Sequence, residues 1–229
     1  MSSRRTSHPI LKAAAAAVLV LGVAAPLNAL YPAAALAQAP RDAGAEQFVM
    51  TQAQRVISVL NDKGQTNAEK IRTFRGLVDE VADVPRVTNF VLGKYARTIT
   101  PAQRAKFAPL FREFAQNVYE NRLGDYHGEN VKVTGSVVRK PGDVVVATTI
   151  SGGKLSEPVM ASWRVLGSGS SWKVVDIQVS GIWLAITQQQ DFVSTIDNAG
   201  GNIDVLIAQL EKQVQQQNQA QQSGARASK

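Results

Sequence analysis

The sequence contains no cysteine in its 229 residues. This absence excludes disulfide bonds, thiol catalysis and cysteine-ligated metal sites, and it excludes a lipoprotein processed at an N-terminal cysteine. Histidine is almost as rare, because only His8 and His127 occur, so a histidine-rich metal site is excluded as well. The fold must therefore be stabilised by the packing of its apolar side chains.

The sequence also lacks the motifs of several common enzyme classes. It has no Gly-x-Ser-x-Gly elbow, no P-loop and no Gly-x-Gly-x-x-Gly segment. The carboxylates Asp125, Glu129 and Asp143 do not follow the spacing of a calcium loop. We expect no catalytic residues, no metal and no cofactor. A small hydrolase that depends on His127 is the alternative outside the class of binding proteins.

Positive charge is present but is not concentrated. The chain carries 25 basic and 18 acidic residues, which gives a net charge of +7. Three of the basic residues precede position 13, and without them the net charge is +4. The other lysines and arginines are interleaved with acids and form no basic stripe of the kind that binds a phosphate backbone, so we expect no nucleic-acid partner.

The N-terminal region has the order of a secretory signal. Basic residues up to Lys12 precede an apolar run over residues 13–25, and Ala35-Leu36-Ala37 provides a cleavage site of small residues. The run is shorter than the roughly 20 strongly apolar residues that a membrane span needs. We therefore predict that residues 1–37 are a signal peptide removed after Ala37, with a retained anchor as the alternative.

Apolar residues that recur three or four positions apart predict the helices. The clearest helix begins at Thr100-Pro101, with Gln103 placed to complete a capping box, and continues to residue 123. Its apolar stripe is rich in aromatic side chains: Phe107, Leu110, Phe111, Phe114 and Val118. Other helices are predicted over residues 42–60, 66–81, 85–96, 182–196 and 202–214. The glutamine-rich segment 215–229 offers little to bury, and we predict that it is disordered.

Between residues 131 and 179 the pattern changes to alternation, and valine and threonine become frequent. Strands are predicted over residues 131–138, 144–150, 158–166 and 172–179, with short glycine-containing turns between them, as in an antiparallel meander. Helices before and after one block of strands indicate an α+β fold. We predict a single domain over residues 38–214, in which helices pack on one face of a curved four-stranded antiparallel sheet and leave an apolar cavity.

Short motifs on both sides of the strands carry a family resemblance. The first are Leu92-Gly93-Lys94-Tyr95 and Thr100-Pro101-Ala102-Gln103-Arg104, followed by Phe107, Phe111 and Tyr119. The later ones are Trp172-Lys173-Val174-Val175-Asp176-Ile177, Gly181, Gln189, Phe192, Gly200, Gly201, Leu206, Ile207 and Leu210. In order and spacing they resemble the MlaC family, also called the toluene-tolerance family. The chain departs from the family at Trp183, where members usually have a small residue.

The resemblance implies a function. Members of this family are periplasmic phospholipid-binding proteins that serve an ABC transporter. By this resemblance we expect a monomeric periplasmic carrier that moves phospholipid between an outer-membrane lipoprotein complex and an inner-membrane ABC transporter complex with an MCE-domain protein, which maintains outer-membrane lipid asymmetry. A carrier of another lipid, such as a hopanoid, is one alternative. A structural adaptor with a solid core is another.

On this hypothesis the acyl chains lie between the long helix and the inner face of the sheet. A double-chain phospholipid has about 30 methylenes worth roughly 0.8 kcal/mol each, so on the order of 25 kcal/mol opposes its exposure to water. We place Tyr95 near the mouth of the cavity. The residues predicted to bind lipid are Val91, Tyr95, Phe111, Phe114, Val118, Val146, Trp163, Val165, Ile177 and Val179.

Overall fold

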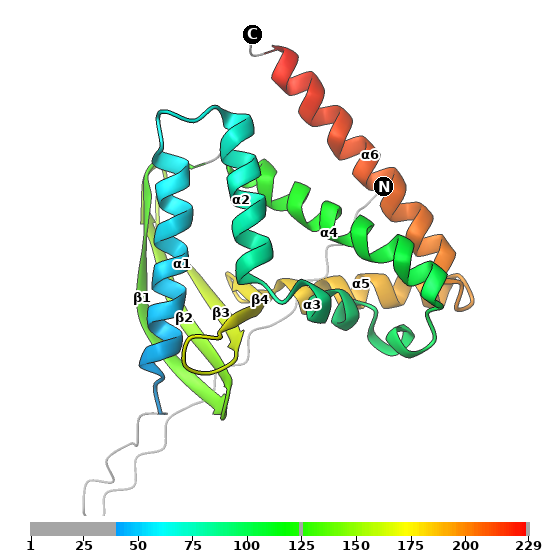
Figure 1. Cartoon of the computed structure of the whole chain (residues 1–229), viewed down its shortest axis with the longest axis horizontal. Coiled ribbons are helices and arrows are strands. Elements are labelled where there is room, and N and C mark those ends of the chain that lie inside the picture. The colour runs from blue at the N-terminus through cyan, green and yellow to red at the C-terminus, as the bar shows by residue number, and fades with distance from the viewer. Residues whose placement is uncertain (1–39, 124–125, 228–229) are drawn as a thin grey trace, which may run out of the picture. The chain divides into compact units, whose positions relative to one another are not determined.

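The computed structural model describes residues 40–123 and 126–227, which belong to one compact unit (Figure 1). The α-helices are α1 (Ala43–Asn61), α2 (Asn67–Val81), α3 (Val84–Val91), α4 (Pro101–Leu123), α5 (Leu184–Asn198) and α6 (Ile203–Ala227), and η1 (Gly93–Arg97) is a 3₁₀ helix. The strands are β1 (Glu129–Lys140), β2 (Asp143–Gly152), β3 (Val159–Leu166), β4 (Lys173–Val179) and β5 (Ile182–Trp183). The predicted signal peptide lies outside the described residues, and the domain boundaries at residues 37 and 214 stay predictions.

Side chains at the helix starts explain where several helices begin. Asp42 accepts a hydrogen bond from the backbone N–H of Ala45 at the start of α1. Thr66 and Glu69 form a capping box at the start of α2. Thr100 and Gln103 exchange the same pair of bonds before α4, with the Gln103 N–H donating to the Thr100 hydroxyl. These local signals were readable from the sequence, and the structure confirms the starts of these helices.

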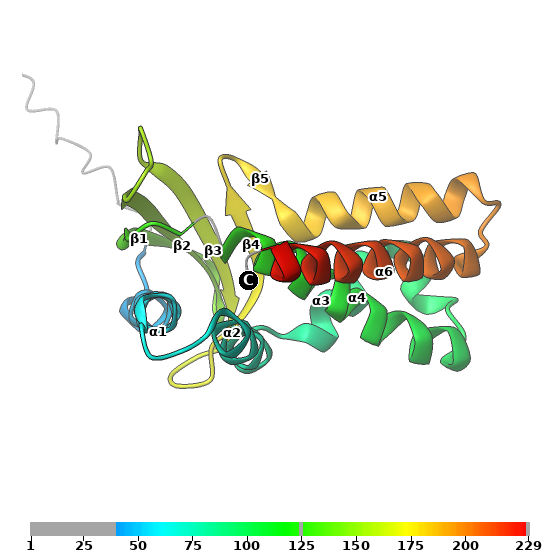
Figure 2. The same ribbon diagram turned by 90° about the horizontal axis from the view of Figure 1, so that it is seen from above.

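The strands pair in chain order, β1-β2-β3-β4-β5, and every neighbouring pair is antiparallel. Helix α1 lies over one face of the sheet, where Ala45 and Val49 bury the inward side chains of β2. Figure 2 shows α1 beside β1 and β2, with α4, α5 and α6 gathered on the far side of β4. The predicted α+β fold with an antiparallel sheet is confirmed. The sequence missed the two-residue strand β5, because two residues are too few to establish an alternating pattern.

Two predicted helices differ from the structure. The single helix expected over residues 85–96 is interrupted, because Gly93 has a φ of +53° and the chain continues as the 3₁₀ helix η1. Phe90, near the end of α3, is 37% exposed. The predicted disorder of residues 215–229 is wrong for the described part of that segment, because α6 continues to Ala227.

The extension of α6 has a physical basis in its composition and in its contacts. Glutamine and alanine are good helix formers, which favours continuation past Val214. The Asn218 side chain also accepts a hydrogen bond from Asn117 at 3.0 Å and donates one to Glu113 at 2.9 Å, and both partners lie on α4. The segment therefore packs through polar side chains, which a search for apolar periodicity does not detect. No helix among the described residues is long and apolar enough to cross a membrane.

Candidate functional site

Most of the buried apolar side chains among the described residues form two clusters, and the ten residues predicted to bind lipid are distributed between and around them. The helical cluster joins residues of α3 to α6. The sheet cluster joins α1 to the inner face of β2, β3 and β4. Helix α4 packs mainly against α6, and few contacts join it to the sheet. The long helix and the sheet thus belong to different clusters, and the predicted lipid-binding residues are divided between them.

The helical cluster is built around three aromatic rings. Phe107 stacks on Phe111 with 5.9 Å between ring centroids, and Phe192 meets both rings edge-on at 5.9 Å. Phe111 is 6% exposed and Val91 is fully buried, so protein side chains already surround these two predicted site residues. Phe114 is only partly buried and packs at the edge of the cluster, 6.4 Å from Phe192.

In the sheet cluster, as in the helical one, some predicted residues are fully buried and others are only partly buried. Val146 and Val165 are fully buried beneath α1, so they belong to the protein core. Trp163 and Ile177 are half-buried, on the inner face. The Trp163 indole N–H donates to the Thr148 hydroxyl at 3.0 Å, which fixes the orientation of the ring. The sheet therefore presents an oriented tryptophan at the incompletely covered end of this cluster.

Two predicted residues belong to neither cluster. Val179 of β4 is half-buried, and it pairs with Ala161 on the inner face of the sheet. Val118 of α4 is 40% exposed, although the stripe over residues 107–114 predicted that it faces inward. Its neighbour Asn117 is fully buried instead, so the inward stripe continues by a step of three rather than four. The expectation that Val118 faces inward is therefore wrong.

Polar contacts join α2 to α4, and no sequence pattern predicted them. The Asn117 side chain accepts a hydrogen bond from Arg75 of α2 at 3.2 Å. Arg112 forms an ion pair with Asp79 of α2, and Gln116 donates to the same carboxylate at 3.4 Å. Each such hydrogen bond contributes about 0.5–1.5 kcal/mol to stability, and a buried side chain such as Asn117 would be costly to leave without a partner. Only the placement of Asn117 three residues after Phe114 could have signalled the contact.

Tyr95 lies away from the sheet, on η1. Its hydroxyl donates to Asp197 of α5, and the Lys94 ammonium forms an ion pair with the same carboxylate at 2.8 Å. The bonds from Lys94 and Tyr95 lower the pKa of Asp197 below its ordinary value. Tyr95 also packs against the helical cluster. In this structure it ties η1 to α5, and its predicted place at a cavity mouth stays untested.

The described residues were also searched for a metal site, for a hydrolase site around His127 and for pockets. Within these residues, no group of three or more histidines and carboxylates could hold a metal ion. His127, which a hydrolase would require, is exposed in the turn before β1, and its backbone N–H donates to the Glu129 side chain at 2.8 Å. The two best-formed pockets include none of the ten predicted residues. One of them lies on the other face of the sheet and is described below.

Comparison with known proteins gives consistent results. The model of a family described as MlaC protein matches residues 50–212. The intermembrane phospholipid transport system binding protein MlaC of Haemophilus influenzae is 24% identical over 131 residues, which are 55% of this chain and 59% of that relative. The chain thus matches less than two thirds of the length of this relative.

A solved structure extends the comparison to the fold. The phospholipid-binding protein of Ralstonia solanacearum, determined in complex with a phospholipid, is similar with a TM-score of 0.67 and 26% sequence identity. The match covers 77% of this chain and 99% of that one. Because the family match spans well over half of the sequence, this protein belongs to the MlaC family.

Proposed function

We propose that this protein is a periplasmic phospholipid carrier. The observation that carries the proposal is the similarity of its fold, over 77% of the chain, to a protein determined in complex with a phospholipid. Membership of the MlaC family supports the same function. The need for a carrier follows from the cost of about 25 kcal/mol for exposing the two acyl chains to water.

The acyl chains would lie between the two apolar clusters. Four predicted residues there are half-buried, and a guest could complete their burial: Phe114, Trp163, Ile177 and Val179. Val91, Phe111, Val146 and Val165 would support this lining from behind, because they are at most 6% exposed. Few contacts join α4 to the sheet, so a guest between them would displace little existing packing.

The family membership supports a proposal for the route of the lipid. We propose that the carrier exchanges phospholipid between an outer-membrane lipoprotein complex and an inner-membrane ABC transporter complex with an MCE-domain protein, and that this exchange maintains outer-membrane lipid asymmetry. No covalent chemistry is required, because the cargo leaves as it entered. The carrier therefore needs only a shielded interior and surfaces that hold it at each complex.

Extraction of the purified mature protein with organic solvent tests this proposal. Mass spectrometry should find co-purified phospholipid in an amount close to that of the protein. Finding a hopanoid instead would identify another cargo, and a consistently lipid-free protein would contradict the proposal. A His127→Ala variant should carry the same lipid as the wild type, because His127 is exposed and is assigned no role in lipid binding.

A further inference from the structure

The face of the sheet turned away from α1 carries a pocket that the proposed lipid site does not use. Partners across antiparallel strands point to the same side of a sheet. Val137, Val145, Arg164 and Asp176 form one such row across four strands. The residues that alternate with this row, such as Val144, pack against α1, so the row itself lies on the opposite, outer face.

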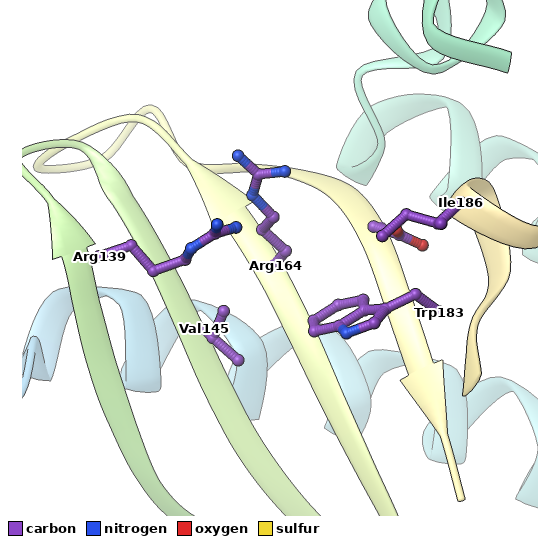
Figure 3. A pocket seen from close by; sticks show the side chains of 6 residues that line it. Arg139, Val145, Arg164, Trp183 and Ile186 are labelled. Atoms are coloured by element: carbon purple, nitrogen blue, oxygen red, sulfur yellow. The ribbon is translucent and has the colours of Figure 1, made fainter. Parts of the chain in front are cut away.

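The outer pocket has a volume of about 210 Å³ and is lined by Arg139, Val145, Arg164, Asp176, Trp183 and Ile186. Figure 3 shows Arg139 and Trp183 pointing into it from opposite sides, with Val145 and Arg164 between them. Pockets that hold drug-sized molecules measure roughly 300–1,000 Å³, so this one is too small for a phospholipid. Its size suits a single side chain inserted by a partner.

The acidic side chains of the outer face are already engaged. Asp143 is 2% exposed and accepts two hydrogen bonds from the Arg164 guanidinium, at 3.0 and 2.8 Å. Asp176 is 9% exposed and accepts bonds from the backbone N–H groups of Ile177 and Ala185, both at 2.8 Å. Both carboxylates are thus bonded within the protein, and Arg139 acts on Asp143 only through its charge, which helps to lower the pKa of Asp143 after the hydrogen bond from Arg164.

The exposed side chains of the outer face include basic and large apolar ones. Arg139 is exposed and forms no hydrogen bond or ion pair with any residue that the structure describes. Lys132, which pairs with Thr149 on the same face, is also exposed. Large apolar side chains are exposed on the same face, because Val137 is 50% exposed and Met160, which pairs with Thr149, is 72% exposed. This surface is complementary to an apolar partner surface that bears a carboxylate.

We propose that the outer face docks a partner protein that inserts an acidic side chain between Arg139 and Trp183. A guanidinium can bind a carboxylate through two parallel hydrogen bonds, and tryptophan and arginine are the residues that most often dominate binding energy at interfaces. A concave pocket fits a protruding side chain better than it fits a flat membrane surface. The inference rests on the proposed function, because a carrier must be held at its donor and acceptor complexes while its cargo passes.

The test measures binding and cargo separately on the full mature chain. Dissociation constants are determined for the purified MCE-domain protein and for the outer-membrane lipoprotein complex, with the wild type, Arg139→Glu and Trp183→Ala. Lys63→Glu, in the exposed turn after α1, is the control because it changes the net charge equally. For at least one partner, Arg139→Glu and Trp183→Ala should each weaken binding about tenfold or more, and the control by less than about twofold.

Three results would overturn the docking proposal. The first is that both variants bind both partners as tightly as the control does. The second is that Arg139→Glu lowers binding to vesicles of equal parts phosphatidylcholine and phosphatidylglycerol while protein binding stays unchanged. The third is that Trp183→Ala separates a dimer of this chain. The lipid content of both variants should match that of the wild type. A lipid-free wild type would contradict the proposed carrier function and not the docking proposal, whatever dissociation constants are measured.

Discussion

Phe111 and Phe114 lie one turn apart on α4, and we propose different roles for them in packing and lipid binding. Phe111 is 6% exposed and packs against both Phe107 and Phe192. Replacing a buried phenylalanine by alanine costs about 3–5 kcal/mol, and the two ring contacts place Phe111→Ala in the upper half of that range. Phe114 is half-buried and has one tilted ring contact, so Phe114→Ala should cost roughly half as much, about 2 kcal/mol.

The lipid content should change in the opposite order. Phe114→Ala removes a residue that we place against the acyl chains, whereas Phe111→Ala leaves that surface in place in the molecules that fold. Urea denaturation gives the free energies of unfolding, and mass spectrometry of the folded fraction gives lipid per protein. The reasoning is refuted if Phe114→Ala is the more destabilising change, or if it retains more lipid than Phe111→Ala.

Three further predictions concern stability, each measured by urea denaturation. Arg164→Ala leaves Asp143 buried without its partner, at a cost of about 3 kcal/mol at pH 7. Because Arg164 lowers the pKa of Asp143, the ion pair stabilises the fold fully above the unfolded pKa of about 3.9, and this stabilisation is lost as pH falls through the pKa of Asp143 in the folded protein. If Arg164→Ala cost as much stability at pH 2 as at pH 7, the role given to this ion pair would be contradicted. Burial raises the pKa of Asp176, so the contribution of Asp176 to stability falls as pH rises through its pKa in the folded protein. The free energy of unfolding of Asp176→Asn should therefore rise relative to that of the wild type between pH 4 and pH 7. A fall relative to the wild type would show that the fold favours the ionised carboxylate. Gly93→Ala should destabilise the fold by more than about 1 kcal/mol, because Gly93 has a φ of +53° and an added Cβ would lie only 2.6 Å from the Val193 side chain. A smaller loss of unfolding free energy would exclude this strain.

The elements with strong local signals were predictable from the sequence. The starts of α1, α2 and α4 follow from capping side chains, and the strands β1 to β4 follow from alternation between glycine turns. The continuation of α6 depends on Asn218 meeting Asn117, a contact between residues about 100 positions apart. No local pattern contains that information.

The candidate site was only partly predictable for the same reason. Periodicity identifies the apolar faces of α4 and the sheet. It does not show which of these residues pack against one another and which remain partly exposed. Phe111 and Phe114 look equivalent in the sequence. They differ in burial because Phe111 packs against both Phe107 and Phe192, whereas Phe114 has a ring contact with Phe192 alone. Trp183, a departure from the family pattern, lies on the outer face and not among the proposed lining residues, which only the register of β4 with β5 reveals.

The central claim is that acyl chains contact Trp163 between the two clusters. A variant that retains Trp163 as its only tryptophan, with Trp172→Phe and Trp183→Phe, is loaded with phospholipid brominated along its acyl chains, and a variant that retains only Trp183 is the control. We predict that bromine quenches the fluorescence of Trp163 strongly and that of Trp183 little. Equal quenching of the two, or an unquenched Trp163 with lipid bound, would contradict the account.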